Sequence, residues 1–298
     1  MLRGYQWPHV AVSGAADGPT VSIIAGIHGA EYPPIDAVMR FCRELDPALL
    51  RGRVVGVPIV NLPAFWERTP FVCPRDGKNL NRVFPGDPAG TFGDVLAHYM
   101  FERVIRRGDY LIDLHAGDLV EELAPFSLVR TTGNDVVDAA AADLATAFGL
   151  PYLVVQPFDG GPIAGTTNGA AAAVGIPAVI AEAGGVGQLD SDAVALHLSG
   201  LRRVLQSLGM LAGEPEPRPA PMRMREFVWL RAARGGFFRR RVAAGDTVTA
   251  GQTIGETVDL WGEPCATTRS PVGGVALFVT TSPAIAENGL IVGVGVPE

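Results

Sequence analysis

The sequence predicts an α/β fold over most of its length and a small all-β unit at its carboxyl end. Up to about residue 212, short β-branched apolar runs alternate with segments of helical periodicity, which is typical of a sheet with helices on both faces. The proline-rich segment GEPEPRPAP follows at 213–221 and reads as a linker. Beyond it, valine- and threonine-rich runs alternate with glycines, and no stretch has a helical period. We therefore expect two domains, residues 1–215 and 216–298.

The expected elements of the first domain follow one another in a regular order. Strands are predicted where short apolar runs are bounded by turn residues, at 21–27, 53–60, 110–114, 152–155 and 177–181. Helices are predicted where apolar residues recur at helical spacing, at 33–45, 92–105, 134–148 and 191–211. Residues 61–88 are rich in Pro, Gly, Asn and Arg and lack clear periodicity. A loop of that length in a compact domain usually has a function.

Composition excludes several classes of protein. The 298 residues are 48% hydrophobic and 18% charged, which excludes a disordered chain. A net charge of −7 argues against nucleic acid as a partner. The longest uncharged stretch, residues 160–181, is broken by prolines and glycines and does not read as a membrane span. Three scattered cysteines indicate neither disulfides nor a cysteine zinc site. We expect a soluble cytoplasmic protein.

Two of the five histidines follow predicted strands. His28 and Glu31 form an H-x-x-E motif directly after the first strand, and His115 closes the third. Two histidines and one carboxylate, with one position open, are the ligands expected of catalytic zinc. Taken alone, His28 and Glu31 also fit a turn histidine followed by a glutamate at a helix start. Asp113, two residues before His115, could orient a ligand histidine or pair with an arginine, and the sequence favours neither.

Two further features adjoin this candidate metal site. Glu182 ends the fifth predicted strand before a double glycine, where a zinc hydrolase would place its general base; a salt-bridged acid is the alternative. Residues 75–86, RDGKNLNRVFPG, carry two arginines and two asparagines within eight positions. Arginine presents a bidentate fork suited to carboxylates, so we expect this segment to bind substrate rather than to be a solvated loop.

Four motifs together resemble the succinylglutamate desuccinylase/aspartoacylase family. They are GIHGAE, NLPAF…RDGKNLNRVFPG, LIDLHAG and AEAGG, and they span about residues 22–190 in the family's order. The resemblance implies a zinc-carboxypeptidase-like mixed sheet with an added C-terminal β domain. It also implies one Zn²⁺ per chain and the following site residues: His28, Glu31 and His115 as metal ligands, Asn81 and Arg82 for the substrate carboxylate, Arg75 for the scissile carbonyl, and Glu182 as the base.

The resemblance implies a zinc-dependent amidohydrolase that removes an acyl group from a small N-acyl amino acid. The continuation HGAEYPP is similar to a branch that deacetylates N-acetylated diamino acids from ectoine breakdown. The C-terminal domain lacks the tyrosine with which aspartoacylases bind substrate, which argues against aspartate specificity. A metallocarboxypeptidase acting on peptides is the alternative enzyme. A non-catalytic binding protein on the same scaffold is a third reading, which the complete set of motif residues disfavours.

The C-terminal domain resembles a barrel-sandwich hybrid of the biotinyl/lipoyl kind. The run VAAGDTV at 242–248 is similar to the recurring turn of those domains. The only lysine of the chain is Lys78, so this domain has no residue to which biotin or lipoate could be attached. We expect it instead to form a wall over the active site that limits substrate size. An uncovered edge of this β domain could pair with a second copy, which makes a homo-oligomer possible.

Overall fold

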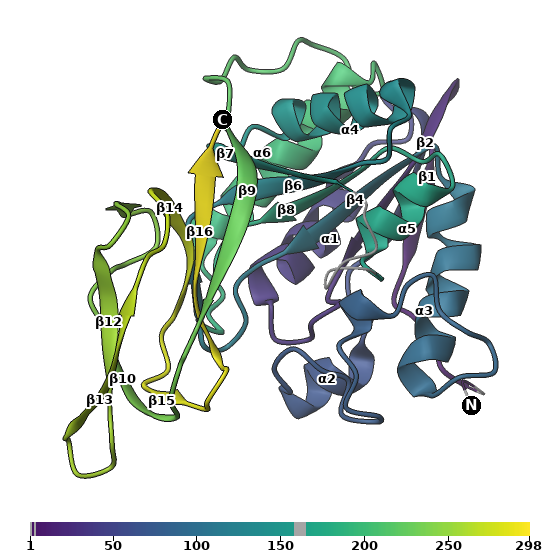
Figure 1. Ribbon diagram of the computed structural model, residues 1–298. Coiled ribbons are helices and arrows are strands. Elements are labelled where there is room, and N and C mark those ends of the chain that lie inside the picture. Colours follow the sequence, from purple (N-terminus) through teal and green to yellow (C-terminus); the bar gives the residue numbers. More distant parts are fainter. Residues whose placement is uncertain (1, 3, 158–164) are drawn as a thin grey trace.

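A computed structural model describes residue 2, residues 4–157 and residues 165–298 (Figure 1). The helices are α1 (Tyr32–Glu44), α2 (Leu62–Glu67), α3 (Phe92–Arg103), α4 (Asp135–Phe148), α5 (Thr167–Ala173) and α6 (Ser191–Ser207), with single 3₁₀ turns at Leu80–Arg82 and Ile105–Arg107. The strands up to the linker are β1 (Val10–Ser13), β2 (Ala16–Ala25), β3 (Arg51–Val57), β4 (Tyr110–His115), β5 (Glu121–Leu123), β6 (Phe126–Thr131), β7 (Tyr152–Pro157) and β8 (Ala178–Glu182). Those after it are β9 (Met222–Arg231), β10 (Gly236–Arg240), β11 (Thr247–Val248), β12 (Thr253–Val258), β13 (Pro264–Arg269), β14 (Gly274–Thr280), β15 (Ala284–Ile285) and β16 (Leu290–Pro297).

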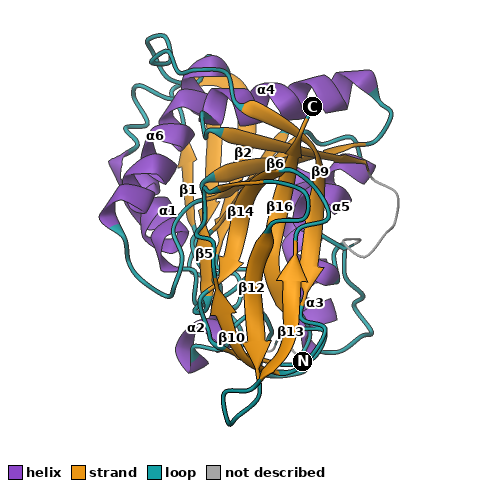
Figure 2. Ribbon diagram, turned by 60° about the vertical axis from the view of Figure 1, so that its left-hand side comes forward, coloured by secondary structure: helices purple, strands orange, loops and turns teal. Residues whose placement is uncertain are grey.

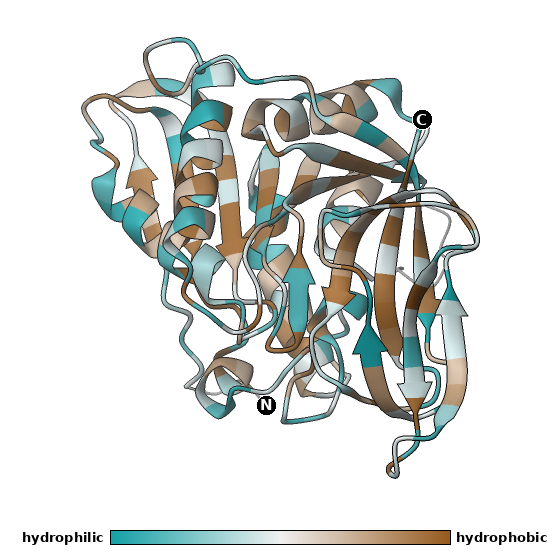
Figure 3. Ribbon diagram, turned by 90° about the vertical axis from the view of Figure 1, so that its left-hand side faces the viewer, coloured by the Kyte–Doolittle hydropathy of each residue, from teal (hydrophilic) through white to brown (hydrophobic). Residues whose placement is uncertain are grey.

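The central strands are buried on both faces because helices cover both sides of the sheet. Figure 2 shows α1 and α6 on one side of the strands and α3 and α5 on the other. Side chains alternate along each strand accordingly: Ile23 of β2 packs in the cluster with α1, α4 and α6, whereas Ile24 packs in the cluster with α3 and α5. The strands inside the molecule are correspondingly hydrophobic (Figure 3). The expected α/β architecture is confirmed.

A single mixed sheet of 12 strands runs through most of the molecule. Its order is β1-β3-β2-β4-β8-β6-β7-β9-β16-β14-β11, with β5 paired to β14. Strands β2, β4 and β8 are parallel neighbours, and β9 adds to β7 in parallel, with Tyr152 opposite Met222. The hydrogen-bonded sheet therefore crosses the expected domain boundary. The C-terminal residues are all β, as predicted, and a second sheet has the order β13-β12-β10-β15.

The segment expected to be one long loop contains helical turns. Asn61 accepts a hydrogen bond from the backbone N–H of Ala64 and so caps α2, while the Asn79 side chain accepts from the N–H of Asn81 at the start of a 3₁₀ turn. Strands β1, β5 and β6 were not predicted. Among the residues that the structure describes, none of the helices is both long and apolar enough to cross a membrane.

Candidate active site

The three expected metal ligands come together at one edge of the sheet. His28 lies three residues beyond the end of β2, Glu31 directly precedes α1, and His115 is the last residue of β4. Because β2 and β4 are parallel neighbours, with Ala25 opposite Leu114, their carboxyl ends meet. A Cβ on Gly29 would lie 2.1 Å from the backbone nitrogen of Phe65, so only glycine lets α2 pack this closely beside His28.

The ligand atoms face a common point. Glu31 Oε1 lies 2.7 Å from His28 Nδ1, and Glu31 Oε2 lies 2.9 Å from His115 Nδ1. One donor atom from each of these residues falls within 4.8 Å of the others. Burial on its own raises the pKa of Glu31, but the two adjacent histidines outweigh it and lower that pKa to about 2. Two imidazole nitrogens and an ionised carboxylate are a donor set that zinc accepts.

The remaining ring nitrogen of each histidine has its own hydrogen-bond partner. Nε2 of His28 lies 3.1 Å from Oδ1 of Asn79, and Nε2 of His115 lies 3.0 Å from Oδ2 of Asp113. The hydroxyl of Thr167 donates to the same oxygen of Asp113. With a metal bound, acceptors in these positions would keep the proton on Nε2 and leave the Nδ1 lone pair for the metal. Among the described residues, Asp113 contacts His115 and Thr167 and no arginine, which is the arrangement expected of a carboxylate that orients a ligand histidine.

Glu182 lies beside this cluster. It ends β8, and its Cα is the register partner of His115 in the neighbouring strand. Burial raises the pKa of Glu182 well above its usual range, although nearby His115 opposes the shift. A carboxyl group with a raised pKa next to a metal site can accept a proton and return it. The role of Glu182 as the general base stays a prediction.

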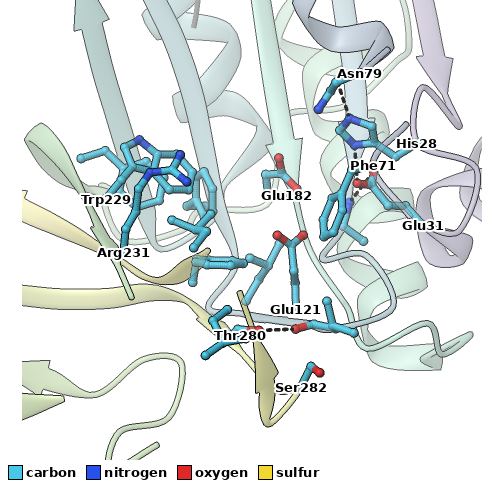
Figure 4. A pocket seen from close by; sticks show the side chains of 18 of the residues that line it. His28, Glu31, Phe71, Asn79, Glu121, Glu182, Trp229, Arg231, Thr280 and Ser282 are labelled. Atoms are coloured by element: carbon cyan, nitrogen blue, oxygen red, sulfur yellow. Dashed lines mark hydrogen bonds and ion pairs between the residues drawn. The ribbon is translucent and has the colours of Figure 1, made fainter. Parts of the chain in front are cut away.

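A pocket of about 690 Å³ joins these residues to the C-terminal strands. Its α/β side includes His28, Glu31, Arg82 and Glu182, and the opposite side includes Phe227, Trp229, Arg231, Phe278 and Thr280. Figure 4 shows Trp229 and Arg231 facing His28 and Glu31 across the pocket, with Glu182 between them. Residues of the C-terminal strands thus line this pocket opposite the candidate metal ligands.

The asparagines and arginines of residues 75–86 take different positions. Arg82 lines the pocket, and its Nη1 donates to the backbone carbonyl of Asn81 at 2.7 Å. The Asn81 side chain is buried and accepts a hydrogen bond from the backbone N–H of Thr167. Asn81 therefore links the 3₁₀ turn at Leu80–Arg82 to the start of α5. Asn79, which the sequence did not single out, lines the pocket beside His28. Asn79 caps the start of the 3₁₀ turn, and Asn81 is the middle residue of that turn.

Arg75 lies outside this pocket. It is exposed and lines a separate pocket with Tyr5, Trp66 and Phe92. The turn at residues 73–78 directs it there, because the side chain of Asp76 accepts from the N–H of Gly93 and the hydroxyl of Thr91 and so ties the turn to the start of α3. The structure does not bring Arg75 together with the other predicted site residues.

Two charged pocket residues had no sequence signal strong enough to single them out. Glu121 is the first residue of β5, and Arg231 is the last residue of β9. Burial raises the pKa of Glu121 to about 7. The Nη1 of Arg231 donates to the backbone carbonyl of Asn288 at 2.9 Å.

Sequence comparison assigns the chain to a known family. The family profile of the succinylglutamate desuccinylase/aspartoacylase catalytic domain matches residues 17–208. The chain belongs to this family. With its His28–Glu31–His115 cluster, this member of the family is a hydrolase of the deacylase type. The family resemblance predicted from the four motifs is confirmed.

One sequence relative and two solved structures match most of the chain. The N-alpha-acetyl-L-2,4-diaminobutyric acid deacetylase of Halomonas elongata is 31% identical over 258 residues, which cover 84% of this chain and 74% of the relative. A succinylglutamate desuccinylase/aspartoacylase from Rhodobacter sphaeroides superimposes with a TM-score of 0.87 at 27% identity, covering 98% of this chain and 89% of that one. The product-bound ectoine utilization protein EutE (DoeB) from Ruegeria pomeroyi gives the same TM-score and identity, covering 97% and 88%.

Proposed function

We propose that this deacylase is a zinc-dependent amidohydrolase that removes an acyl group from a small N-acyl amino acid, and that N-acetylated diamino acids are its preferred substrates. One observation carries the proposal: the His28–Glu31–His115 cluster and Glu182 share a pocket that the C-terminal strands wall off. The H. elongata relative acts on N-acetyl-diaminobutyrate, and the R. pomeroyi relative belongs to ectoine utilization. Both support this class of substrate.

In this proposal each residue of the site has a separate role in hydrolysis. Zinc held by His28, Glu31 and His115 would supply a Lewis acid and make water acidic enough to react near pH 7. Glu182 takes the proton of the attacking water and delivers it to the leaving amine. Arg82 binds the substrate carboxylate and so orients the amide for attack. Asn81, whose carbonyl accepts from Arg82, holds that guanidinium in place.

The C-terminal wall favours small substrates over peptides. Phe227, Trp229 and Phe278 close the side of the pocket opposite the metal ligands. A volume of about 690 Å³ suits a small molecule, whereas a peptide chain would need an open groove. These three side chains therefore weigh against the carboxypeptidase alternative.

A cytoplasmic location and pairing with a second copy through a sheet edge stay predictions.

A substrate screen tests the proposal. The zinc-loaded protein is incubated with Nα-acetyl-L-2,4-diaminobutyrate, N-acetyl-L-aspartate, N-succinyl-L-glutamate and a dipeptide that ends in a free carboxylate. We expect the highest kcat/KM for the acetylated diamino acid and negligible cleavage of the dipeptide. Cleavage of the dipeptide alone would replace the deacylase proposal by the carboxypeptidase one. The same protein with His115→Ala is the control for contaminating hydrolases.

A further inference from the structure

Strand β5 places one carboxylate inside the pocket and the next one outside it. Side chains alternate along a strand, so Glu121 and Leu123 line the pocket while Glu122 points away. Glu122 forms an ion pair with Arg240 on the C-terminal unit. Glu121 forms no ion pair with any residue within the described ranges 4–157 and 165–298. Two neighbouring glutamates thus have opposite environments.

The backbone holds Glu121 rigidly in position. Its Cα is the register partner of Thr280 in β14, so the C-terminal unit fixes it from one side. Its backbone N–H donates to the carbonyl of Asp118 at 3.0 Å, and its carbonyl accepts from the N–H of Val186 at 2.8 Å. Its carboxylate accepts one hydrogen bond, from the N–H of Asp118 to Oε2 at 3.0 Å. The carboxyl group is therefore pre-oriented, and no Lys, Arg or His of the described ranges forms an ion pair with it.

The surroundings of Glu121 favour a cationic partner for its carboxylate. Figure 4 shows Glu121 directed into the same part of the pocket as Glu182, near Phe71 and Glu31. Phe71, Val120, Leu123 and Phe278 line the same pocket, and none of them can solvate a charge. A carboxylate in such a place costs free energy unless a partner compensates it.

We propose that Glu121 binds a cationic group on the side chain of the substrate and makes the enzyme select N-acyl amino acids with a side-chain ammonium. This inference rests on the proposed deacylase function and assigns its specificity to one residue. The ammonium would supply the missing partner through a charge-assisted hydrogen bond. The same carboxylate would repel N-acyl aspartate or glutamate, whose side chains are anionic. Arg82 remains available for the α-carboxylate.

The test compares two substrates of similar size that differ in the charge of the side-chain end. Nα-acetyl-L-2,4-diaminobutyrate ends in an ammonium, and N-acetyl-L-norvaline ends in a methyl group at the same position. Loss of a hydrogen bond to a charged group corresponds to a decrease of about 10- to 100-fold. We expect Glu121→Gln to lower kcat/KM for the diamino substrate by about that factor and to leave the value for N-acetyl-norvaline within about threefold of wild type. Glu122→Gln is the matched control and should change neither.

Other results separate this inference from the proposed function. If Glu121→Gln lowers kcat/KM equally for both substrates, or wild type does not prefer the diamino substrate, the inference is overturned while the deacylase function stands. If wild type hydrolyses neither substrate, the deacylase proposal is the one that has failed. Calorimetric binding of L-2,4-diaminobutyrate then decides the inference: weaker binding to Glu121→Gln than to Glu122→Gln supports it, and equal binding overturns it.

Discussion

The two sides of the pocket differ in strand topology and in the chemistry of their side chains. The α/β side brings titratable groups together because parallel strands end at one edge of the sheet, which places His28, His115 and Glu182 side by side. The C-terminal side comes from antiparallel strands and presents mainly aromatic faces, with Phe227 and Phe278 among them. The proposals above accordingly place the chemistry on the first side and give the second side a part in the selection of substrate size and charge. Each prediction below tests this division.

Glu182→Gln should have the largest effect among the single substitutions that leave the metal ligands intact. The amide keeps the size of the side chain but cannot accept the proton of the attacking water, so we expect kcat to fall by about 10²- to 10⁴-fold. The metal content, measured by elemental analysis, should stay at the wild-type level because Glu182 is not a ligand. Near-normal turnover would remove Glu182 from the mechanism.

Arg82→Ala should have the next largest effect. The guanidinium lines the pocket and is the proposed partner of the substrate carboxylate. Losing a bidentate charged contact should lower kcat/KM by about 10- to 100-fold. For substrates whose carboxylate is amidated, the substitution should lower kcat/KM only slightly, because these substrates cannot form the contact in the wild-type enzyme either. An equal loss for both substrates would show that Arg82 acts through folding instead.

Trp229→Ala tests the aromatic wall. Removal of the indole enlarges the pocket on the side opposite the metal ligands. We expect kcat/KM for N-acetyl-diaminobutyrate to fall by roughly 3- to 10-fold, since buried contact area is lost, while longer N-acyl groups gain relative to acetyl. Trp66→Ala, at an exposed tryptophan of the second pocket, is the matched control. An unchanged ratio of long to short acyl groups would mean that the wall does not set substrate size.

Arg75→Ala should have the smallest effect. Its side chain is exposed and lines the second pocket, so the substitution should change kcat/KM by less than about threefold, as is usual for surface positions. The same steady-state assay used for Arg82→Ala checks this. A loss of two orders of magnitude would restore the carbonyl-polarising role predicted for Arg75 from the family motif. It would also require the turn at 73–78 to move during catalysis.

Much of the fold and the site could be predicted because the central strands are short apolar runs with clear ends. His28, His115 and Glu182 stand directly after such runs, and the topology of a parallel sheet brings strand ends together. Glu31 followed from its spacing to His28. The strand that carries Glu121 has three residues and exists through pairing with β14, more than 150 positions along the chain, which no local pattern reveals.

The prediction for Arg75 shows where sequence order stops being informative. Arg75 and Arg82 lie seven positions apart in one motif, yet the turn at 73–78 sends them into different pockets. The proline-rich segment at 213–221 likewise marked a change in composition correctly. It could not show that β9 pairs with β7 in the same sheet, because Tyr152 and Met222 are separated along the chain by α5, β8 and α6.

Metal-dependent hydrolysis of Nα-acetyl-L-2,4-diaminobutyrate tests the central claim most directly. Wild-type protein is stripped with a chelator, dialysed and titrated with Zn²⁺ while acetate release is measured, with His115→Ala treated in parallel. The account predicts that activity disappears on chelation and returns with a break at one zinc per chain, and that His115→Ala regains none. Activity that persists in metal-free protein, or full recovery by His115→Ala, would contradict it.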